Sequence, residues 1–366
     1  MRVFSREQLN AAAAAAIASS AKQAYNCGIM NTPINRMFAA MVALCALASG
    51  CGQLSGWVLK PVPLDESLKE TVLATDPGLF VTDKIVVVDV DGMLFNQRPE
   101  ASIFGWRENP VALFVEKLDK VQGDKNVKAV VLRINSPGGS VTASDIMYAR
   151  LMTLRKRRGI PVVAILEDVG ASGAYYLACG ADTILAHPTS VTGSIGVIVQ
   201  TVSFAGTMKL LGIEAKAVTS GARKDMASPL KPLDEEDLAI LKEMVDGFYE
   251  RFLGVVAASR TKLKPARLRE LADGRVFTGE QALKAGLVDG VGYMSDAIAL
   301  ARTKADIKRA KVIMYHRPIG YRANVYSTAP PVVPQVNLLN LTAPDLAYPV
   351  RPQFLYLWTG HTTRGG

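Results

Sequence analysis

A small-residue turn around a serine, and a lysine further along, are the features of this 366-residue chain best suited to chemistry. Ser172 stands in residues 170–173 (GASG), where neighbours with almost no side chain would let a bulky acyl group approach its hydroxyl. A free serine hydroxyl is a poor nucleophile near neutral pH and needs a base. None of the three histidines stands in a comparable setting. Lys224, in residues 220–225 (SGARKD), is therefore the candidate base.

A lysine can serve as a base when burial removes the solvation of its ammonium form and so lowers its pKa. Ser-Lys pairs are a known variant of the Ser-His-Asp arrangement. Taken singly, Ser172 could be a helix N-cap and Lys224 a solvated surface charge. Asp225 follows Lys224 directly and would favour its charged form if both faced the same way, so we expect no catalytic role for Asp225. Together the two motifs predict a serine hydrolase with a lysine general base.

A second glycine turn, residues 136–140 (SPGGS), could supply the oxyanion hole. Gly138 and Gly139 allow backbone dihedrals and close approaches that a side chain would block. Backbone N–H groups freed there, with that of Gly173 beside the nucleophile, could point at an oxyanion, and each such donor stabilises the transition state by about 3 kcal/mol. Alternatively, the turn is only a tight connection. Ser194 could hydrogen-bond the lysine amine or simply cap a turn.

The composition excludes several other classes of function. The net charge of +9 is spread in short basic runs without interleaved aromatic residues, so we expect no nucleic-acid binding. A solvated helix face or attraction to anionic lipid headgroups explains these runs better. The four cysteines do not form a disulfide framework, because Cys27, Cys45 and Cys51 precede the expected folded body. No metal and no cofactor are predicted.

Alternating apolar strands and helices must position these motifs. Residues 84–90, 127–134 and 160–166 are predominantly apolar, and helical patterns separate them. Strands of this kind are typical of an α/β fold with a mainly parallel sheet that is covered on both faces. The two glycine turns then follow strands and lead into helices. A long amphipathic helix, capped by Asp234, extends the body.

The chain divides into four predicted segments. Residues 84–310 form the folded catalytic body, and residues 60–83 read as a proline-containing linker before it. Residues 311–366 form a proline-rich tail, in which residues 354–358 (FLYLW) are an apolar patch that we expect another surface to receive. Residues 1–59 form an export signal or a membrane anchor.

The N-terminal segment predicts delivery to a bacterial cell membrane, with the catalytic body outside the cytoplasm. Arg36 precedes an uncharged apolar run at residues 37–47, and residues 48–51 (ASGC) follow. This layout is that of a secretory signal, and its end resembles a lipobox that would make Cys51 the lipidated first residue. An uncleaved transmembrane helix over residues 37–59 is the alternative, and a soluble exported form is a third possibility. Translation could also begin at Met30.

Five sequence blocks together resemble the signal peptide peptidase A family, serine peptidases of the S49 type. The resemblance spans residues 84–301 and implies the spiral of ββα units shared by Clp protease and the crotonases, with a helical extension. It implies that Ser172 is the nucleophile and Lys224 the base, with Gly138 or Gly139 and Gly173 at the oxyanion hole. It further implies a homo-oligomeric ring in which neighbouring subunits supply serine and lysine, and cleaved signal peptides as substrates. The blocks are residues 133–139 (RINSPGG), 170–176 (GASGAYY), 191–197 (VTGSIGV), 220–225 (SGARKD) and 272–279 (ADGRVFTG).

Three other interpretations remain open at this point. The same spiral fold hosts acyl-CoA hydratases and isomerases, whose glycine turns bind a thioester oxyanion. A membrane scaffold could retain the fold and lose the chemistry, although Ser172 and Lys224 are both present. A phage prohead-type protease is a third alternative, which the export signal disfavours.

Overall fold

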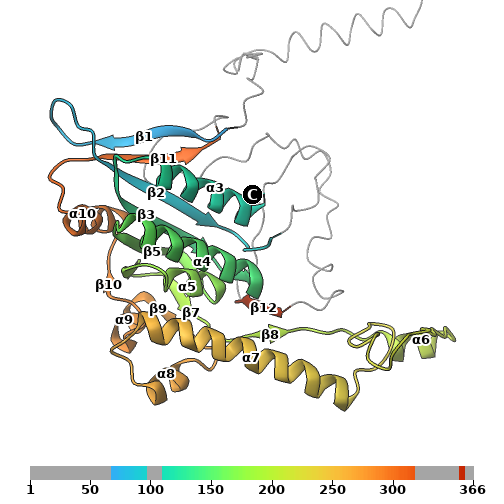
Figure 1. Cartoon of the computed structure of the whole chain (residues 1–366). Coiled ribbons are helices and arrows are strands. Elements are labelled where there is room, and N and C mark those ends of the chain that lie inside the picture. Colours follow the sequence, from blue (N-terminus) through green and yellow to red (C-terminus); the bar gives the residue numbers. More distant parts are fainter. Residues whose placement is uncertain (1–66, 97–108, 318–353, 359–366) are drawn as a thin grey trace, which may run out of the picture. The chain divides into compact units, whose positions relative to one another are not determined.

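The computed structural model describes residues 67–96, 109–317 and 354–358 (Figure 1). Within them, a nine-stranded sheet has the order β1-β11-β2-β3-β5-β6-β10, and β7 pairs with β5 and with β9. All of its pairings are parallel except β1–β11 and β7–β9. The predicted α/β fold with a mainly parallel sheet is therefore confirmed. The strands are β1 (Lys69–Thr75), β2 (Lys84–Asp91), β3 (Val127–Ser136), β5 (Val162–Ala171), β6 (Thr183–Ala186), β7 (Val191–Gly193), β9 (Val276–Thr278), β10 (Gly290–Val291) and β11 (Lys311–His316).

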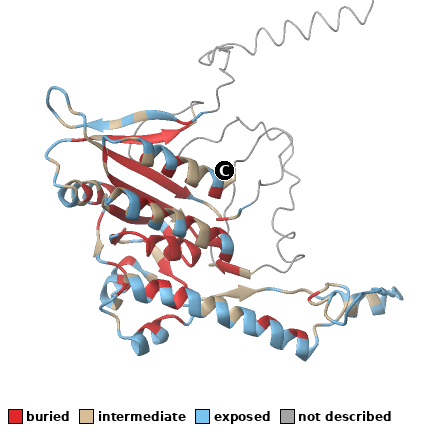
Figure 2. Ribbon diagram, in the orientation of Figure 1, coloured by how far each residue is buried: buried red, intermediate tan, exposed pale blue. Residues whose placement is uncertain are grey.

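The central strands are largely apolar because helices cover both faces of the sheet. In β2, Val86 and Val88 pack toward α3 and α4, whereas Ile85 and Val87 pack toward α10. All four side chains have no exposed surface. Figure 2 shows this buried layer between the half-exposed helices. The helices are α3 (Pro110–Gly123), α4 (Val141–Arg158), α5 (Gly173–Ala178), α6 (Ala205–Leu210), α7 (Glu235–Ser259), α8 (Pro265–Leu271), α9 (Gly279–Ala285) and α10 (Met294–Lys304).

Local capping residues fix where several helices begin and end. Asp234 caps α7 by accepting from the backbone N–H of Asp237 at 2.7 Å. Thr278 begins α9 with a capping box, and α9 ends at Gly286 in a left-handed conformation (φ 77°). The cap at Asp234 was predicted from the sequence and is confirmed.

A second, three-stranded sheet joins distant parts of the chain. Its order is β4 (Gly138–Ser140), β12 (Phe354–Leu357) and β8 (Ile198–Val199), with β12 antiparallel to both neighbours. Tyr356 in β12 has no exposed surface, stacks on Tyr176 at 5.2 Å between ring centroids, and donates its hydroxyl hydrogen to the carbonyl of Phe248. The expectation that another surface receives the apolar patch of the tail is confirmed.

The folded body extends further at both ends than the sequence pattern predicts. β1 lies within the expected linker, β11 lies within the expected tail, and the two pair with each other at one end of the sheet. β1 is mostly exposed, so its sequence lacks the predominantly apolar pattern that marks a central strand. Residues 1–59, including Cys51, lie outside the described residues. Among the helices that the structure does describe, none is long and apolar enough to cross a membrane.

One segment projects from the body. We call residues 200–234, which connect β8 to α7 and include α6, the arm (Figure 1). The first half of α7 is largely exposed, whereas Phe252, Leu253 and Val256 near its end pack into the core. The arm is thus attached to the body at its two ends, and most of its length is exposed to solvent (Figure 2).

Candidate active site

Ser172 lies at the sharp turn from β5 into α5. Its backbone has φ 53° and ψ −118°, a conformation that a residue with a side chain rarely adopts and that costs free energy. The surrounding structure holds it on both sides: its N–H donates to the carbonyl of Gly193 at 2.8 Å, and its carbonyl accepts from Tyr176 at 2.9 Å. Ser172 occupies the N-cap position, yet its side chain makes no capping hydrogen bond. Its hydroxyl therefore does not cap the helix, which is the usual structural role of a serine at this position.

The two predicted glycine turns meet beside Ser172. Gly138 has φ 98°, and a Cβ there would collide with the carbonyl oxygen of Tyr356 and lie 2.7 Å from the amide nitrogen of Gly173. A Cβ on Gly173 would collide with the hydroxyl of Ser144. A Cβ on Gly139 would collide with the backbone of Leu94. Glycine is required here by close backbone approach, because no larger residue fits.

Asn135 links the two strands that carry these turns. Its side-chain oxygen accepts from the N–H of Val169 at 3.2 Å, and its amide nitrogen donates to Asp168 at 3.4 Å. Ser136, next in β3, accepts from the N–H of Gly138 through its hydroxyl at 3.1 Å. These contacts set the position of the Gly138 turn relative to the segment that leads into Ser172.

An extended segment of the tail lies along the Gly138 turn. In β12, Leu355, Tyr356 and Leu357 face Ser140, Gly139 and Gly138 respectively. The N–H of Trp358 continues the pairing by donating to the carbonyl of Pro137 at 2.9 Å. This edge of the fold therefore accepts an extended peptide as an additional β-strand, at the glycines that adjoin Ser172.

Ser194 lies near Ser172 and lines an open cavity. Its backbone is left-handed (φ 48°), and its N–H donates to the carbonyl of Arg275 at 2.8 Å. The preceding residue is Gly193, the partner of the Ser172 backbone. The cavity of about 460 Å³ is lined by Ser194 and by Leu357 and Trp358 at the end of the tail strand. Ser194 thus faces the region through which the extended segment passes.

Lys224 lies on the arm, and a single chain does not bring it to Ser172. Lys224 is exposed, whereas only 1% of Ser172 is exposed within the body. Among the described residues, the Lys224 side chain makes no hydrogen bond or ion pair, with Ser172 or with any other group. The structure therefore brings Ser172 together with Gly138, Gly139, Gly173 and Ser194, but not with Lys224.

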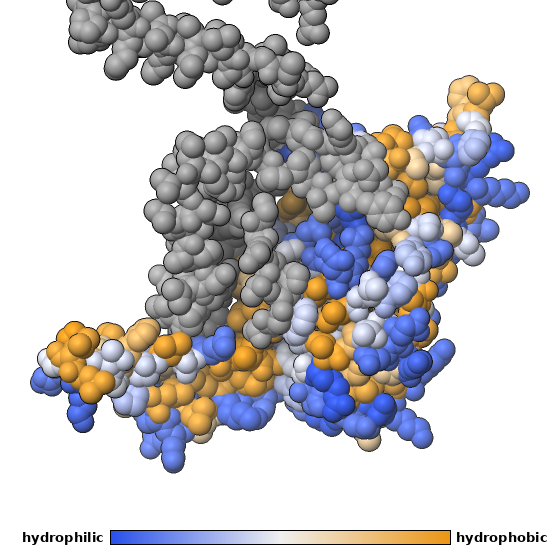
Figure 3. Space-filling model, turned by 180° about the vertical axis from the view of Figure 1, so that it is seen from behind, coloured by the Kyte–Doolittle hydropathy of each residue, from blue (hydrophilic) through white to orange (hydrophobic). Residues whose placement is uncertain are grey.

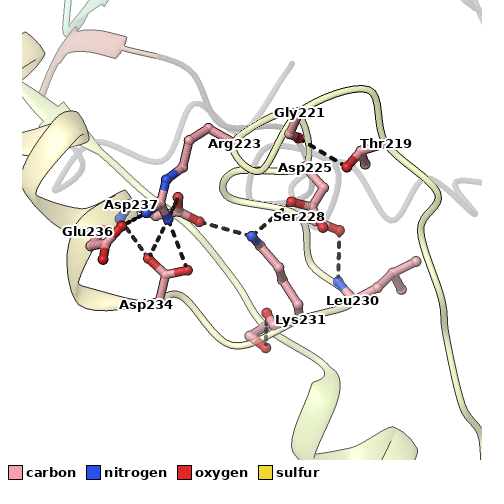
Figure 4. Close-up of polar contacts among 11 residues, drawn as sticks. Thr219, Gly221, Arg223, Asp225, Ser228, Leu230, Lys231, Asp234, Glu236 and Asp237 are labelled. Atoms are coloured by element: carbon pink, nitrogen blue, oxygen red, sulfur yellow. Dashed lines mark hydrogen bonds and ion pairs between the residues drawn. The ribbon is translucent and has the colours of Figure 1, made fainter.

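Charged residues that flank Lys224 hold its loop against the start of α7 (Figure 4). The buried carboxylate of Asp237 accepts from Arg223 at 3.0 Å and is paired with Lys231 at 3.0 Å. Burial alone would raise the pKa of Asp237, but the hydrogen bonds from Lys231 and Arg223 outweigh it and lower this pKa below its ordinary value. The sequence analysis missed this cluster. The sequence does contain an indication of this cluster, because four consecutive acidic residues at the start of α7 follow a basic loop.

Comparisons with known proteins show which proteins this chain resembles. Residues 154–308 match peptidase family S49. An Enterococcus faecium protein that carries the name signal peptide peptidase SppA is 38% identical over 232 residues, which cover 63% of this chain and 67% of that protein. Protease 4 of Salmonella typhi is 38% identical over 188 residues, covering 51% of this chain and 30% of that protein. The segment matched by the family contains Ser172, Ser194 and Lys224.

A solved structure, that of a membrane-bound stomatin-specific protease, aligns with this chain at 14% identity and a TM-score of 0.38. The alignment covers 60% of this chain and 85% of that protein. In the part of the chain that the structure describes, no cluster of His, Cys, Asp and Glu side chains is suited to hold a metal ion.

Proposed function

The chain belongs to peptidase family S49 and is a serine peptidase, and from this premise we propose that it is an endopeptidase with a Ser172–Lys224 dyad. The observation that carries the proposal is the turn at Ser172. Its strained backbone leaves the hydroxyl without a capping role, directly beside a groove that accepts an extended peptide. Strand-to-helix turns of this kind hold the nucleophile of other serine hydrolases.

In the proposed reaction, Ser172 Oγ attacks the carbonyl carbon of the scissile bond while its proton passes to the neutral amine of Lys224. The resulting oxyanion accepts hydrogen bonds from backbone N–H groups at Gly173 and at the Gly138–Gly139 turn. The Lys224 ammonium then donates the proton to the leaving nitrogen, and the C–N bond breaks. Water hydrolyses the acyl-enzyme in the same way, with Lys224 again acting as the base.

The proposed active site is completed between two copies of the chain. Ser172 lies within the body, whereas Lys224 is exposed on the arm, so a neighbouring copy in a ring could supply the lysine. Apolar side chains also gather on the arm, where solvent now meets them (Figure 3). An apolar surface of this kind is typical of a protein interface. These side chains are Phe204 (46% exposed), Leu210 (88%), Leu211 (70%), Ile213 (55%), Val218 (102%) and Leu230 (51%).

The proposed substrates are extended apolar peptides, such as the signal peptides released at a membrane. The apolar tail strand Phe354–Leu357 supports this assignment, because it pairs by backbone hydrogen bonding on either side of its length. A substrate in the same place would bind by strand addition and would have to displace β12. Membrane association through residues 1–59, with lipidation at Cys51, would bring the enzyme to such peptides and place its body outside the cytoplasm.

Hydrolysis of a fluorogenic apolar peptide by the purified full-length protein tests the proposal. We expect Ser172→Ala to reduce kcat by at least about 10⁴-fold while leaving the melting temperature and the assembly state unchanged, because the nucleophile is lost without loss of packing. Ser295→Ala is the matched control, since Ser295 is exposed on α10, and it should retain full activity. Wild-type turnover by Ser172→Ala would contradict the proposal.

A further inference from the structure

The loop that carries Lys224 contains a second lysine with a different role. Lys231 lies 2.9 Å from Asp225 and 3.0 Å from Asp237, measured from its Nζ to one carboxylate oxygen of each (Figure 4). These two hydrogen bonds raise the pKa of Lys231, so it stays protonated. Lys231 is therefore a fixed positive charge and is unsuited to act as a base.

Asp225 is the carboxylate closest in sequence to Lys224, and its side chain is paired with Lys231. The Asp225 side chain accepts from Lys231 and is turned toward Asp237 at the start of α7. On the other side of Lys224, Arg223 is also turned toward α7, where it pairs with Asp234 and Asp237. Both neighbours of Lys224 in the sequence are thus held on the helix side, and Lys224 itself is exposed.

We propose that Lys231, anchored on the buried Asp237, is a positioning residue for the base. It neutralises Asp225 and keeps that carboxylate from stabilising the ammonium form of Lys224. This inference rests on the proposed function, in which Lys224 must lose its proton to take one from Ser172. A carboxylate within about 4–6 Å of an ammonium group favours the charged form, and would oppose that loss.

The other charged groups around the loop do not replace Lys231. Arg223 pairs with Asp234, Glu236 and Asp237 at the start of α7. Beyond α6, Lys216 pairs with Glu214. The remaining charged side chains here are those of Lys209 on α6 and Glu235 on α7, and both are exposed. Without Lys231, Asp225 would be an unneutralised carboxylate directly next to Lys224.

The pH dependence of peptide hydrolysis by the assembled full-length enzyme tests the inference. Activity should rise with pH as the base loses its proton, and the midpoint of that rise is the readout. We expect Lys231→Met to move the midpoint upward by about one pH unit and to reduce kcat at pH 7 about tenfold, with little change in KM. Asp225→Asn, added to Lys231→Met, should return the midpoint to the wild-type value. Lys231→Arg should preserve it, because arginine keeps the positive charge.

Lys242→Met is the matched control, because Lys242 pairs with Asp246 on the exposed surface of α7 and has no contact with the loop. An unmoved midpoint in a correctly assembled Lys231→Met enzyme would overturn the inference, as would a failure of Asp225→Asn to restore it. If Lys231→Met does not assemble, Lys231→Gln, which keeps a hydrogen-bond donor but carries no charge, takes its place. An upward shift of the midpoint in that variant supports neutralisation by Lys231, and an unmoved midpoint contradicts it. Activity in Lys224→Ala would instead contradict the proposed function itself.

Discussion

The body around Ser172 and the arm around Lys224 are stabilised by different kinds of interaction. The Ser172 turn is buried, strained and held by backbone hydrogen bonds with Gly193 of β7 and Tyr176 of α5. The Lys224 loop is exposed and is held mainly by ion pairs on one buried carboxylate, that of Asp237. Burial and close packing within one chain suffice to fix the position of Ser172, the proposed nucleophile. Lys224, the proposed base, has no such surroundings among the described residues of one chain, where its side chain is exposed.

This contrast explains why the active site would require assembly. An exposed lysine keeps its proton near neutral pH, whereas burial away from water lowers its pKa. Docking of the apolar arm against a second body would supply that environment and bring Lys224 to Ser172 in one step. Substitutions in the body and in the arm should therefore impair peptide hydrolysis in different ways.

The largest effect in the arm is expected from Lys224→Arg. Arginine retains positive charge and length but keeps its proton, so we expect a loss of kcat of about 10³-fold or more, equal to that of Lys224→Ala. Because the loop is held by Arg223, Lys231 and Asp237, the assembly state should not change. Lys209→Arg on α6 is the control and should retain activity. Substantial hydrolysis by Lys224→Arg would exclude a general base at this position.

A smaller but still large effect is expected in the body from Gly138→Ala. The added Cβ would collide with the carbonyl of Tyr356 at a left-handed backbone position, and would displace the turn beside Gly173. Misplacing oxyanion donors should reduce kcat by about 10²-fold to 10³-fold. Gly159→Ala is the control, since Gly159 is also left-handed (φ 61°) but has open space around it. It should lower stability by about 1 kcal/mol without affecting kcat. Equal kcat values for the two variants would show that Gly138 is not part of the active site.

The smallest effect on activity is expected from removal of residues 354–366. Without β12, the edge of β4 is free for a substrate, so KM should fall several-fold. The same deletion uncovers Tyr176 and Phe252, which pack against Tyr356, and should lower the free energy of unfolding by about 3 kcal/mol. Peptide kinetics and thermal melting of the same preparation measure both changes. An unchanged KM would show that the tail strand does not occupy the substrate groove.

The central fold was predictable because its signals are local. The predominantly apolar sequences of β2 and β3 predict buried parallel strands, and the structure confirms them. The meeting of the Gly138 and Ser172 turns follows from this, because parallel neighbours end at the same edge of a sheet. The pairing of β1 with β11 was not predictable, since β1 is mostly exposed and the two strands are separated by most of the chain.

The site was predictable only in part for a similar reason. Ser172 and its glycine neighbours form a contiguous motif, whereas the ion pairs of Lys231 with Asp225 and Asp237 depend on how the loop folds back on α7. From the sequence, Asp237 is indistinguishable from a solvated acid in the first turn of a helix. Its complete burial is a property of the tertiary structure. The same holds for the surroundings of Lys224, which no described part of its own chain encloses.

The most direct test of the account is complementation between two inactive chains. Ser172→Ala and Lys224→Ala, carrying different affinity tags, are co-expressed, and mixed assemblies are isolated by sequential purification. If neighbouring copies share an active site, some interfaces combine an intact Ser172 with an intact Lys224. We predict that these mixed assemblies recover about a quarter or more of wild-type peptide hydrolysis, in contrast to either variant alone. No recovery in mixed assemblies would show that serine and lysine act within one chain, and would contradict the division of the site between body and arm.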